Sequence, residues 1–192
     1  MIITSTDDIL TEVLPALKDM VKAKGHVIAA IDGRCASGKS TLAKALKNEL
    51  SCSVVQMDHF FLQPHQRTSE RLKRPGGNVD MERFSAEVLE NLLTGVDFSY
   101  RPFDCQVQDF AKEVHIPQSE IYLIEGAYSC LFAEHFNYKI FMTVSNEEQI
   151  NRLRQRNPTM LQRFLEEWIP LEEKYFEFFK VEELCNITYN TG

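Results

Sequence analysis

Apolar and polar residues alternate in blocks along this chain, and the blocks predict strands that alternate with helices. Short apolar runs indicate buried strands, whereas apolar residues that recur every three or four positions indicate helices with one buried face. Strands are expected at 26–32, 53–57, 121–124, 138–144 and 186–189. Helices are expected at 5–23, 39–50, 81–93, from 145 to about 156 and from about 159 to 179. This alternation is typical of an α/β fold with a parallel sheet.

Two stretches break the pattern. Residues 62–80 are polar and rich in turn formers, which predicts a loop or a mobile excursion. The turn formers are Pro64, Pro75, Gly76 and Gly77. The second stretch, residues 99–117, is expected to form two short extended pieces. Within the last expected helix, Pro170 is expected to interrupt the helical hydrogen bonding.

Length and composition favour one domain, residues 1–192, whose first element is a helix within 1–24. The chain has 192 residues, of which 44% are hydrophobic and 26% are charged, and single domains commonly span about 100–200 residues. Acidic residues outnumber basic ones by 28 to 21, which gives a formal charge of -7. This balance disfavours a dedicated nucleic-acid binder, which would carry a basic face.

Cysteine spacing and hydropathy bear on other classes of protein. The five cysteines are odd in number, widely spaced and without a C-x-x-C pair, so neither a disulfide framework nor a zinc site is expected. Scattered reduced cysteines suit a cytoplasmic protein. The longest central apolar run, residues 27–31, is far shorter than the ~20 residues of a membrane helix. The first residues do not have the pattern of a signal peptide, so we expect no membrane partner.

The most specific motif is GRCASGKS, residues 33–40, which fits the phosphate-binding pattern G-x-x-x-x-G-K-[ST] completely. An apolar strand is expected before it and a helix after it, as a phosphate-binding loop (P-loop) requires. Glycines let such a loop turn tightly, and the positive end of the helix dipole attracts the phosphates. We expect ATP to contact Gly33, Ala36, Ser37, Gly38, Lys39, Ser40 and Thr41.

Two side chains of the motif have expected roles of their own. Lys39 would reach the β- and γ-phosphates as a catalytic residue, and the Ser40 hydroxyl would bind Mg²⁺. The chain has no N-K-x-D motif for reading guanine and little beyond the sheet, which favours a metabolite kinase over a switch GTPase or a motor ATPase.

Acidic residues stand directly after two of the expected strands. Asp58 follows the strand at 53–57, and Glu125 follows the strand at 121–124. Ligands of open parallel sheets gather at the carboxyl ends of the strands. We therefore expect Asp58 to accept the proton of the acceptor hydroxyl, and Glu125 to hold Mg²⁺ or its waters in a catalytic role.

Together these motifs resemble the uridine kinase-like family of P-loop kinases, which includes uridine/cytidine kinases, nicotinamide riboside kinase and phosphoribulokinase. The resemblance rests on the P-loop, on MDHFF at 57–61, on IEG at 124–126 and on W-x-P-x-E-x-x-Y at 168–175. It covers most of residues 26–190. It implies a three-layer α/β P-loop NTPase fold with a parallel sheet of about five strands.

The resemblance also implies roles on the acceptor side, in the segments 62–80 and 99–117. Asp58 matches the catalytic base of the family, and Asp80 matches the acid that holds the ribose hydroxyls. Phe103 falls where the family places an aromatic ring against the base, and Phe61 is a further candidate for that wall.

Residues 145–165 correspond to the lid of the family, whose arginines close over the transferring phosphate. Arg152 and Arg156 are four residues apart, so they share a helix face. The planar guanidinium group binds phosphate oxygens in pairs, which suits this catalytic role.

Two departures from the family leave the nucleobase open. Uridine kinases usually read N-F-D-x-P around the ribose acid, whereas this chain has NVDMERF at 78–84. Their base-reading segment usually reads Y-D-F, whereas this chain has FDC at 103–105. We expect transfer of the γ-phosphate to a nucleoside-like small molecule, with the 5′-hydroxyl of uridine or cytidine as the first choice.

Alternatives stay open on the acceptor. Nicotinamide riboside is one of them, and a sugar phosphate is another, since a basic cluster in 67–74 either is solvated or attracts an anionic acceptor. The cluster consists of Arg67, Arg71, Lys73 and Arg74. A nucleotide-binding regulatory module without catalysis is the alternative from another class. A homo-oligomer also stays open.

Overall fold

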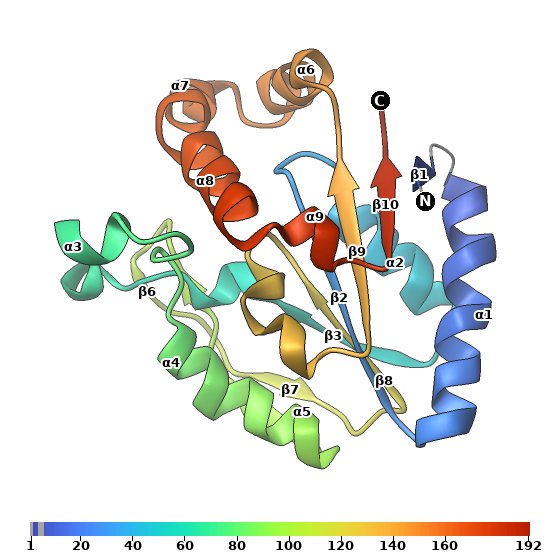
Figure 1. The fold of residues 1–192 in the computed structure, drawn as a ribbon. Coiled ribbons are helices and arrows are strands. Elements are labelled where there is room, and N and C mark those ends of the chain that lie inside the picture. Colours follow the sequence, from blue (N-terminus) through green and yellow to red (C-terminus); the bar gives the residue numbers. More distant parts are fainter. Residues whose placement is uncertain (1, 4–5) are drawn as a thin grey trace.

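A parallel sheet forms the centre of the molecule (Figure 1). The computed structural model describes residues 2–3 and 6–192. Its central strands are β1 (Ile2–Ile3), β2 (Val27–Gly33), β3 (Cys52–Gln56), β8 (Ile121–Glu125), β9 (Tyr138–Thr143) and β10 (Ile187–Asn190). All pairs are parallel, in the order β1-β10-β9-β2-β8-β3. The five strands expected from the apolar runs are all present, and the two-residue β1 is an addition at the edge.

Helices cover both faces of the sheet, which confirms the three-layer α/β fold. On one face lie α1 (Thr6–Lys24) and α2 (Lys39–Glu49). On the other face lie α4 (Met81–Phe84), α5 (Glu90–Thr94) and α8 (Ile169–Phe179). Residue 5, where the first helix was expected to begin, lies outside the described residues. Within the described parts of the chain, no helix is both long and apolar enough to cross a membrane.

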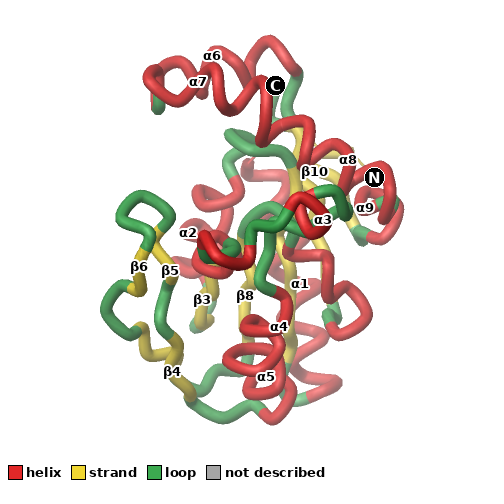
Figure 2. The backbone as a smooth tube through the Cα atoms, turned by 90° about the vertical axis from the view of Figure 1, so that its left-hand side faces the viewer, coloured by secondary structure: helices red, strands yellow, loops and turns green. Residues whose placement is uncertain are grey.

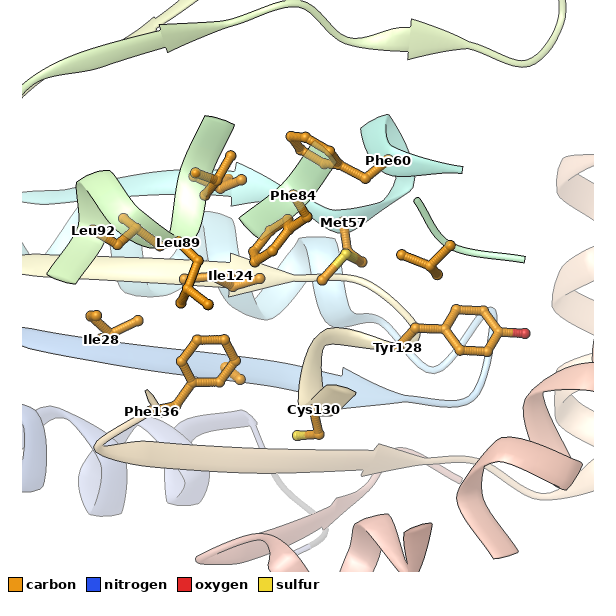
Figure 3. Close-up of a cluster of buried hydrophobic side chains, with 14 of the residues drawn as sticks. Ile28, Met57, Phe60, Phe84, Leu89, Leu92, Ile124, Tyr128, Cys130 and Phe136 are labelled. Atoms are coloured by element: carbon orange, nitrogen blue, oxygen red, sulfur yellow. The ribbon is translucent and has the colours of Figure 1, made fainter. Parts of the chain in front are cut away.

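The central strand β2 contributes to both hydrophobic cores, because successive side chains of a strand point to opposite faces. Val27 and Ile31 pack with α1 and α2, whereas Ile28 packs on the opposite side. Figure 3 shows this second core, in which Phe84 and Leu92 lie on the same side of the sheet as Ile28. Full burial of such side chains stabilises the fold by about 1.5–3 kcal/mol each.

A helical arm, residues 146–184, connects β9 to β10. It consists of α6 (Asn146–Arg156), a 3₁₀ turn (Pro158–Met160), α7 (Leu161–Arg163), a π turn (Phe164–Trp168), α8 and α9 (Val181–Leu184). The Ser145 hydroxyl accepts the Glu148 N–H at 3.4 Å and caps α6, as the S-x-x-E pattern predicts. Figures 1 and 2 show α6 and α7 beyond the carboxyl ends of the strands.

Pro170 interrupts the regular hydrogen bonding of the arm without ending the helix. Proline cannot donate a backbone hydrogen bond, and the π turn directly before α8 takes up the irregularity. The helix expected at 81–93 contains a similar π turn, Ser85–Leu89, between α4 and α5. Such turns leave no pattern in the sequence that separates them from ordinary helix.

Residues 99–117 contain short extended pieces, as expected, but four of them rather than two. The region forms two antiparallel pairs, β4 (Phe98–Tyr100) with β7 (Val114–Ile116) and β5 (Phe103–Asp104) with β6 (Asp109–Phe110). The tight reversal between β5 and β6 contains neither glycine nor proline, so its turn signal is limited to the flanking aspartates. The Asp104 carboxylate accepts the Gln106 N–H at 2.7 Å instead, and Gln108 adopts a φ of 57°.

The excursion 62–80 is pinned at its base. Leu62 N–H donates to Asn78 O at 3.0 Å, and Asp80 N–H donates to Phe60 O at 2.7 Å. Between these ends the chain forms a 3₁₀ turn (Pro64–Gln66) and the short helix α3 (Ser69–Leu72). The base therefore keeps Asp80 beside the segment that follows β3. A further 3₁₀ segment that the sequence did not predict, Ser129–His135, lies between β8 and β9.

Replacing Gly33 with alanine should destabilise the fold strongly. Gly33 has a φ of 130°, and a Cβ there would lie 1.9 Å from Met142 O of the neighbouring strand. Backbone strain and overpacking together should lower the free energy of unfolding by about 2–6 kcal/mol. Gly95→Ala is the matched control, since Gly95 also has a positive φ of 68° but nothing lies within 4 Å; it should cost only about 1 kcal/mol. Urea denaturation measures both, and equal losses would contradict the expectation.

Candidate active site

The P-loop lies between β2 and the first turn of α2, where the motif predicts it. Ala36 and Gly38 adopt positive φ values of 60° and 95° and so turn the chain tightly. Gly38 caps α2 without any side-chain acceptor, which leaves the first N–H groups of the helix unbonded by a cap. The buried Ser37 hydroxyl has no hydrogen-bond partner among the described residues. Free donors at a helix N-terminus and an unpaired hydroxyl fit a phosphate group.

The Lys39 side chain lies back along the loop that precedes it. Its Nζ donates to Gly33 O at 2.7 Å and to Arg34 O at 2.8 Å. The ammonium group is thus held next to the loop donors, where it adds positive charge. Its charge also acts on Asp58 and Glu125, and it counteracts the upward shifts in their pKa values.

Ser40 and Glu125 meet across the sheet edge. Ser40 Oγ donates to Glu125 Oε2 at 3.2 Å, so the structure brings together the two residues expected to hold Mg²⁺. Among residues 2–3 and 6–192, no group of three His, Cys, Asp or Glu side chains could hold a metal ion. Mg²⁺ commonly takes one or two protein ligands and completes its shell with phosphates and water. The Ser40–Glu125 pair fits such an ion.

Asp58 lies beside this pair. It belongs to the 3₁₀ turn Met57–Phe60, which directly follows β3. The neighbouring strand β8 leads into Gly126, and a Cβ on Gly126 would lie 3.3 Å from Asp58 Oδ1. The two acids expected at the strand ends are therefore neighbours in space.

Burial and neighbouring charges change the pKa values of both Asp58 and Glu125. Burial, and then the charge of Asp58, raise the pKa of Glu125. Burial also raises the pKa of Asp58, while Lys39, His59 and Arg156 lower it. Asp58 keeps an exposed surface, so solvent screens part of its shift. A carboxylate with a raised pKa is a better proton acceptor than an ordinary one.

Asp32 is a buried acid beside the P-loop that the sequence analysis did not single out. It is fully buried at the end of β2, and burial raises its pKa. Its carboxylate accepts the N–H groups of Gly33 at 2.6 Å, Tyr128 at 3.1 Å and Cys130 at 2.8 Å, and the Tyr175 hydroxyl at 2.8 Å. The signal available in the sequence was an acid inside an apolar run, since a buried acid must collect hydrogen-bond donors.

The structure places Asp80 close to the site but engages both of its oxygens. Oδ1 accepts the Arg83 N–H at 3.1 Å and caps α4, and Oδ2 accepts Gln66 Nε2 at 2.8 Å. Only 3% of the residue is exposed. The role of Asp80 toward ribose hydroxyls stays a prediction, and it requires Gln66 to share Oδ2.

Arg83 organises the acceptor side and was also missed. Its guanidinium group lies 4.2 Å from the centre of the Phe60 ring and donates to His59 O, next to Asp58. It also donates to Arg101 O at 2.9 Å, which ties the turn to the strands that follow. Burial lowers the pKa of Arg83. Its position three residues after the capping acid was the only hint in the sequence.

The two predicted aromatic residues differ in accessibility. Phe103 is 3% exposed and packs edge-on against Phe110, with ring centres 5.7 Å apart. Phe61 is only partly buried and lies 6.4 Å from the ring of Tyr128. Phe61 therefore retains more surface for a ligand than Phe103.

The two predicted lid arginines lie in different surroundings. Arg152 donates to Ala36 O at 3.2 Å, to Thr191 Oγ1 at 2.8 Å and to Thr191 O at 2.7 Å, and it pairs with Glu148 at 2.8 Å. It thus fastens α6 to the P-loop. Arg156 is exposed, and its charge lowers the pKa of Asp58. Arg156 is the better placed of the two to meet a phosphate.

Two of the four basic residues in 67–74 form ion pairs with neighbouring acids. Arg71 pairs with Glu82 at 2.5 Å, and Arg74 pairs with Glu70 at 2.7 Å. Arg67 donates to Leu62 O at 3.0 Å. These contacts weaken the case for the cluster as a grip on an anionic acceptor.

Comparison with known proteins bears on the fold. No protein-family model matches the sequence, and no match was found among curated proteins. A protein described as a possible uridine kinase from Bacillus stearothermophilus is similar in structure, with a TM-score of 0.62 and 18% identity. That match covers 93% of this chain and 99% of the other. D-glycerate 3-kinase from Cryptococcus neoformans has a TM-score of 0.63 and 13% identity, over 88% of this chain and 87% of the other.

The chain has the P-loop kinase fold. This confirms the structural side of the likeness to uridine kinase-like proteins that the motifs indicate. The two similar proteins are named for different substrates, and at these identities the likeness concerns the fold alone.

Glu125→Gln should stabilise the protein at alkaline pH. Because the pKa of Glu125 is raised above its ordinary 4.5 in the folded state, the ionised side chain opposes folding above that raised pKa. Glutamine removes this charge, and its amide oxygen can still accept the Ser40 hydroxyl. Urea denaturation should show a gain at pH 8 that shrinks as the pH falls through the raised pKa toward 4.5. Glu120→Gln, at an exposed position, is the control; a loss of stability in Glu125→Gln at pH 8 would refute the expectation.

Proposed function

We propose that the protein is a kinase that transfers the γ-phosphate of ATP to a hydroxyl group of a small molecule. One observation carries the proposal: Asp58 lies next to Gly126, beside the hydrogen-bonded pair of Ser40 and Glu125. A module that only binds a nucleotide needs the loop and a metal ligand. The additional acid at the neighbouring strand end is the group that an acceptor hydroxyl requires.

Each residue of the proposed site has a separate role in the transfer. The N–H groups of the P-loop and the Lys39 ammonium group hold the phosphates and balance their charge. Mg²⁺, held by Ser40 and Glu125, supplies further charge neutralisation when it is bound. Asp58 orients the acceptor hydroxyl and takes its proton, and its raised pKa helps it to do so. Arg156 contributes positive charge from the arm.

A nucleoside-like acceptor is the first choice within this proposal. Asp80 is held two residues beyond the base of the excursion, near the Asp58 turn, and a carboxylate can accept hydrogen bonds from both hydroxyls of a ribose. The family resemblance of MDHFF and the likeness to the possible uridine kinase support uridine or cytidine. The ion pairs of Arg71 and Arg74 disfavour a sugar phosphate. The unpaired thiols agree with a cytoplasmic location.

Asp58→Asn should abolish most phosphoryl transfer but leave ATP binding intact. The amide is nearly isosteric with the carboxylate but cannot take the proton, and general-base assistance is worth about 10²–10⁴-fold in rate. ADP release in a coupled assay, over a panel of nucleosides, pantothenate and pentose phosphates, measures kcat, and calorimetry measures the Kd for ATP. Asp97→Asn, at a position where the side chain is 67% exposed, is the control.

The outcomes separate the proposal from its alternatives. Wild-type protein that binds ATP but phosphorylates no acceptor would point to a regulatory module. Full turnover in Asp58→Asn would remove Asp58 from the role of base. Loss of ATP binding in this variant would instead assign Asp58 to the nucleotide side.

Asp80→Asn should raise the acceptor KM by about tenfold or more and leave the ATP KM nearly unchanged. Asparagine still caps a helix well, so the variant removes the charge for the ribose hydroxyls without removing the cap of α4. The wild-type enzyme should also use 2′-deoxynucleosides poorly, because they lack one of the two hydroxyls. Steady-state kinetics with matched ribo- and deoxyribonucleosides provide the measurement. An unchanged acceptor KM would mean that Asp80 serves only the protein itself.

A further inference from the structure

Helix α8 holds the P-loop region from outside through two buried side chains. The Tyr175 hydroxyl donates to Asp32 Oδ2 at 2.8 Å, and the Cys35 N–H donates to Glu172 Oε2 at 2.9 Å. Glu172 is 6% exposed and Tyr175 is fully buried. These are the E and the Y of the W-x-P-x-E-x-x-Y stretch, and the proposed transfer reaction uses neither of them.

Helix α6, at the other end of the helical arm, contacts the same part of the loop. Gln149 Nε2 donates to Cys35 O at 2.9 Å, and Arg152 donates to Ala36 O at 3.2 Å. Both backbone groups of Cys35 are therefore bonded to side chains of the helical arm. The next residue, Ala36, has the positive φ of 60° that turns the loop toward the phosphate donors.

The part of the arm between these anchors is residues 157–168, the outer segment. It joins the end of α6 to the start of α8, and Figure 1 shows it at the carboxyl end of the sheet. Arg156, the last residue of α6 directly before the outer segment, is exposed, and its charge acts on Asp58. The outer segment is thus connected to the P-loop region at both of its ends, through α6 and through α8.

We propose that Glu172 is a positioning residue that links the P-loop to the outer segment, so that binding of ATP moves this segment. The proposal rests on the proposed ATP binding and goes beyond it. A carboxylate at hydrogen-bond distance from a buried N–H fixes that peptide, and removal of the carboxylate leaves the buried donor unpaired. Because α8 is a continuous helix, a shift of the Cys35 peptide is carried to the π turn and Trp168.

The chain contains its own reporter for this motion. Trp168 is the only tryptophan in the sequence. It lies at the end of the π turn, one helical turn before Glu172, with the Phe164 ring centre at 4.5 Å and the Arg163 guanidinium at 4.9 Å. Its fluorescence therefore reports on the packing of the outer segment. Titration with Mg²⁺ and a non-hydrolysable ATP analogue needs no acceptor, and calorimetry measures the binding independently.

In the wild-type protein the analogue should change the Trp168 fluorescence with saturation. Glu172→Ala should raise the Kd of the analogue about tenfold and lose more than half of the fluorescence change at saturation. Glu172→Gln should behave as wild type, because its amide oxygen can still accept the Cys35 N–H. Glu177→Ala is the matched control, an exposed glutamate on the same helix. Melting temperatures establish that each variant is folded, and Glu172→Asp, whose shorter side chain lengthens the contact with the Cys35 N–H, takes the place of Glu172→Ala if that variant does not fold.

Each of the other outcomes would overturn the positioning role of Glu172, its link to the outer segment, or the proposed function. If Glu172→Ala, or Glu172→Asp in its place, keeps both the wild-type Kd and the full fluorescence change, the positioning role is overturned. If the wild-type protein binds the analogue without any change at Trp168, the link is overturned while ATP binding stands. If calorimetry detects no binding to the wild-type protein, the proposed function itself fails, and this inference falls with it.

Discussion

The buried carboxylate of Asp32 is the constraint on which the arrangement of the site depends. An ionised group without partners inside a protein costs several kcal/mol, so the chain must bring donors to it. The donors come from the turn after β8, at Tyr128 and Cys130, and from α8, at Tyr175. Three segments far apart in the sequence are thereby fixed at one point. The P-loop begins at the next residue, so its position relative to the acids and to the arm follows from this point.

The sequence predicts the fold where burial alone determines the structure. The runs at 26–32 and 121–124 are apolar on both faces, and only a central parallel strand covered by helices on both sides accounts for them. The β5–β6 reversal could not be predicted in the same way. It depends on the Asp104 carboxylate and on a left-handed Gln108, and a single aspartate without a glycine or proline in the turn does not fix where the chain reverses.

The residues of the candidate site also differ in whether the sequence alone could predict them. Lys39, Ser40, Asp58 and Glu125 could be named in advance, because each belongs to a motif or follows a strand at the edge where ligands bind. The surroundings of Arg152 could not, since its contacts with Ala36 and Thr191 join residues 116 and 39 positions away, respectively. Asp32 and Glu172 were hidden for the same reason: their partners become neighbours only after the chain has folded.

The pinned base of the excursion 62–80 has a consequence for how such a protein can diversify. Backbone hydrogen bonds join Leu62 to Asn78 and Phe60 to Asp80, so residues 63–77 form a closed loop on a fixed base. The length and composition of this loop can drift without altering the separation of Asp58 and Asp80, because the cost of closing a loop grows slowly with its length. Under the proposed function, the loop that can vary with the acceptor and the residues that carry phosphoryl transfer therefore lie in separable parts of the sequence.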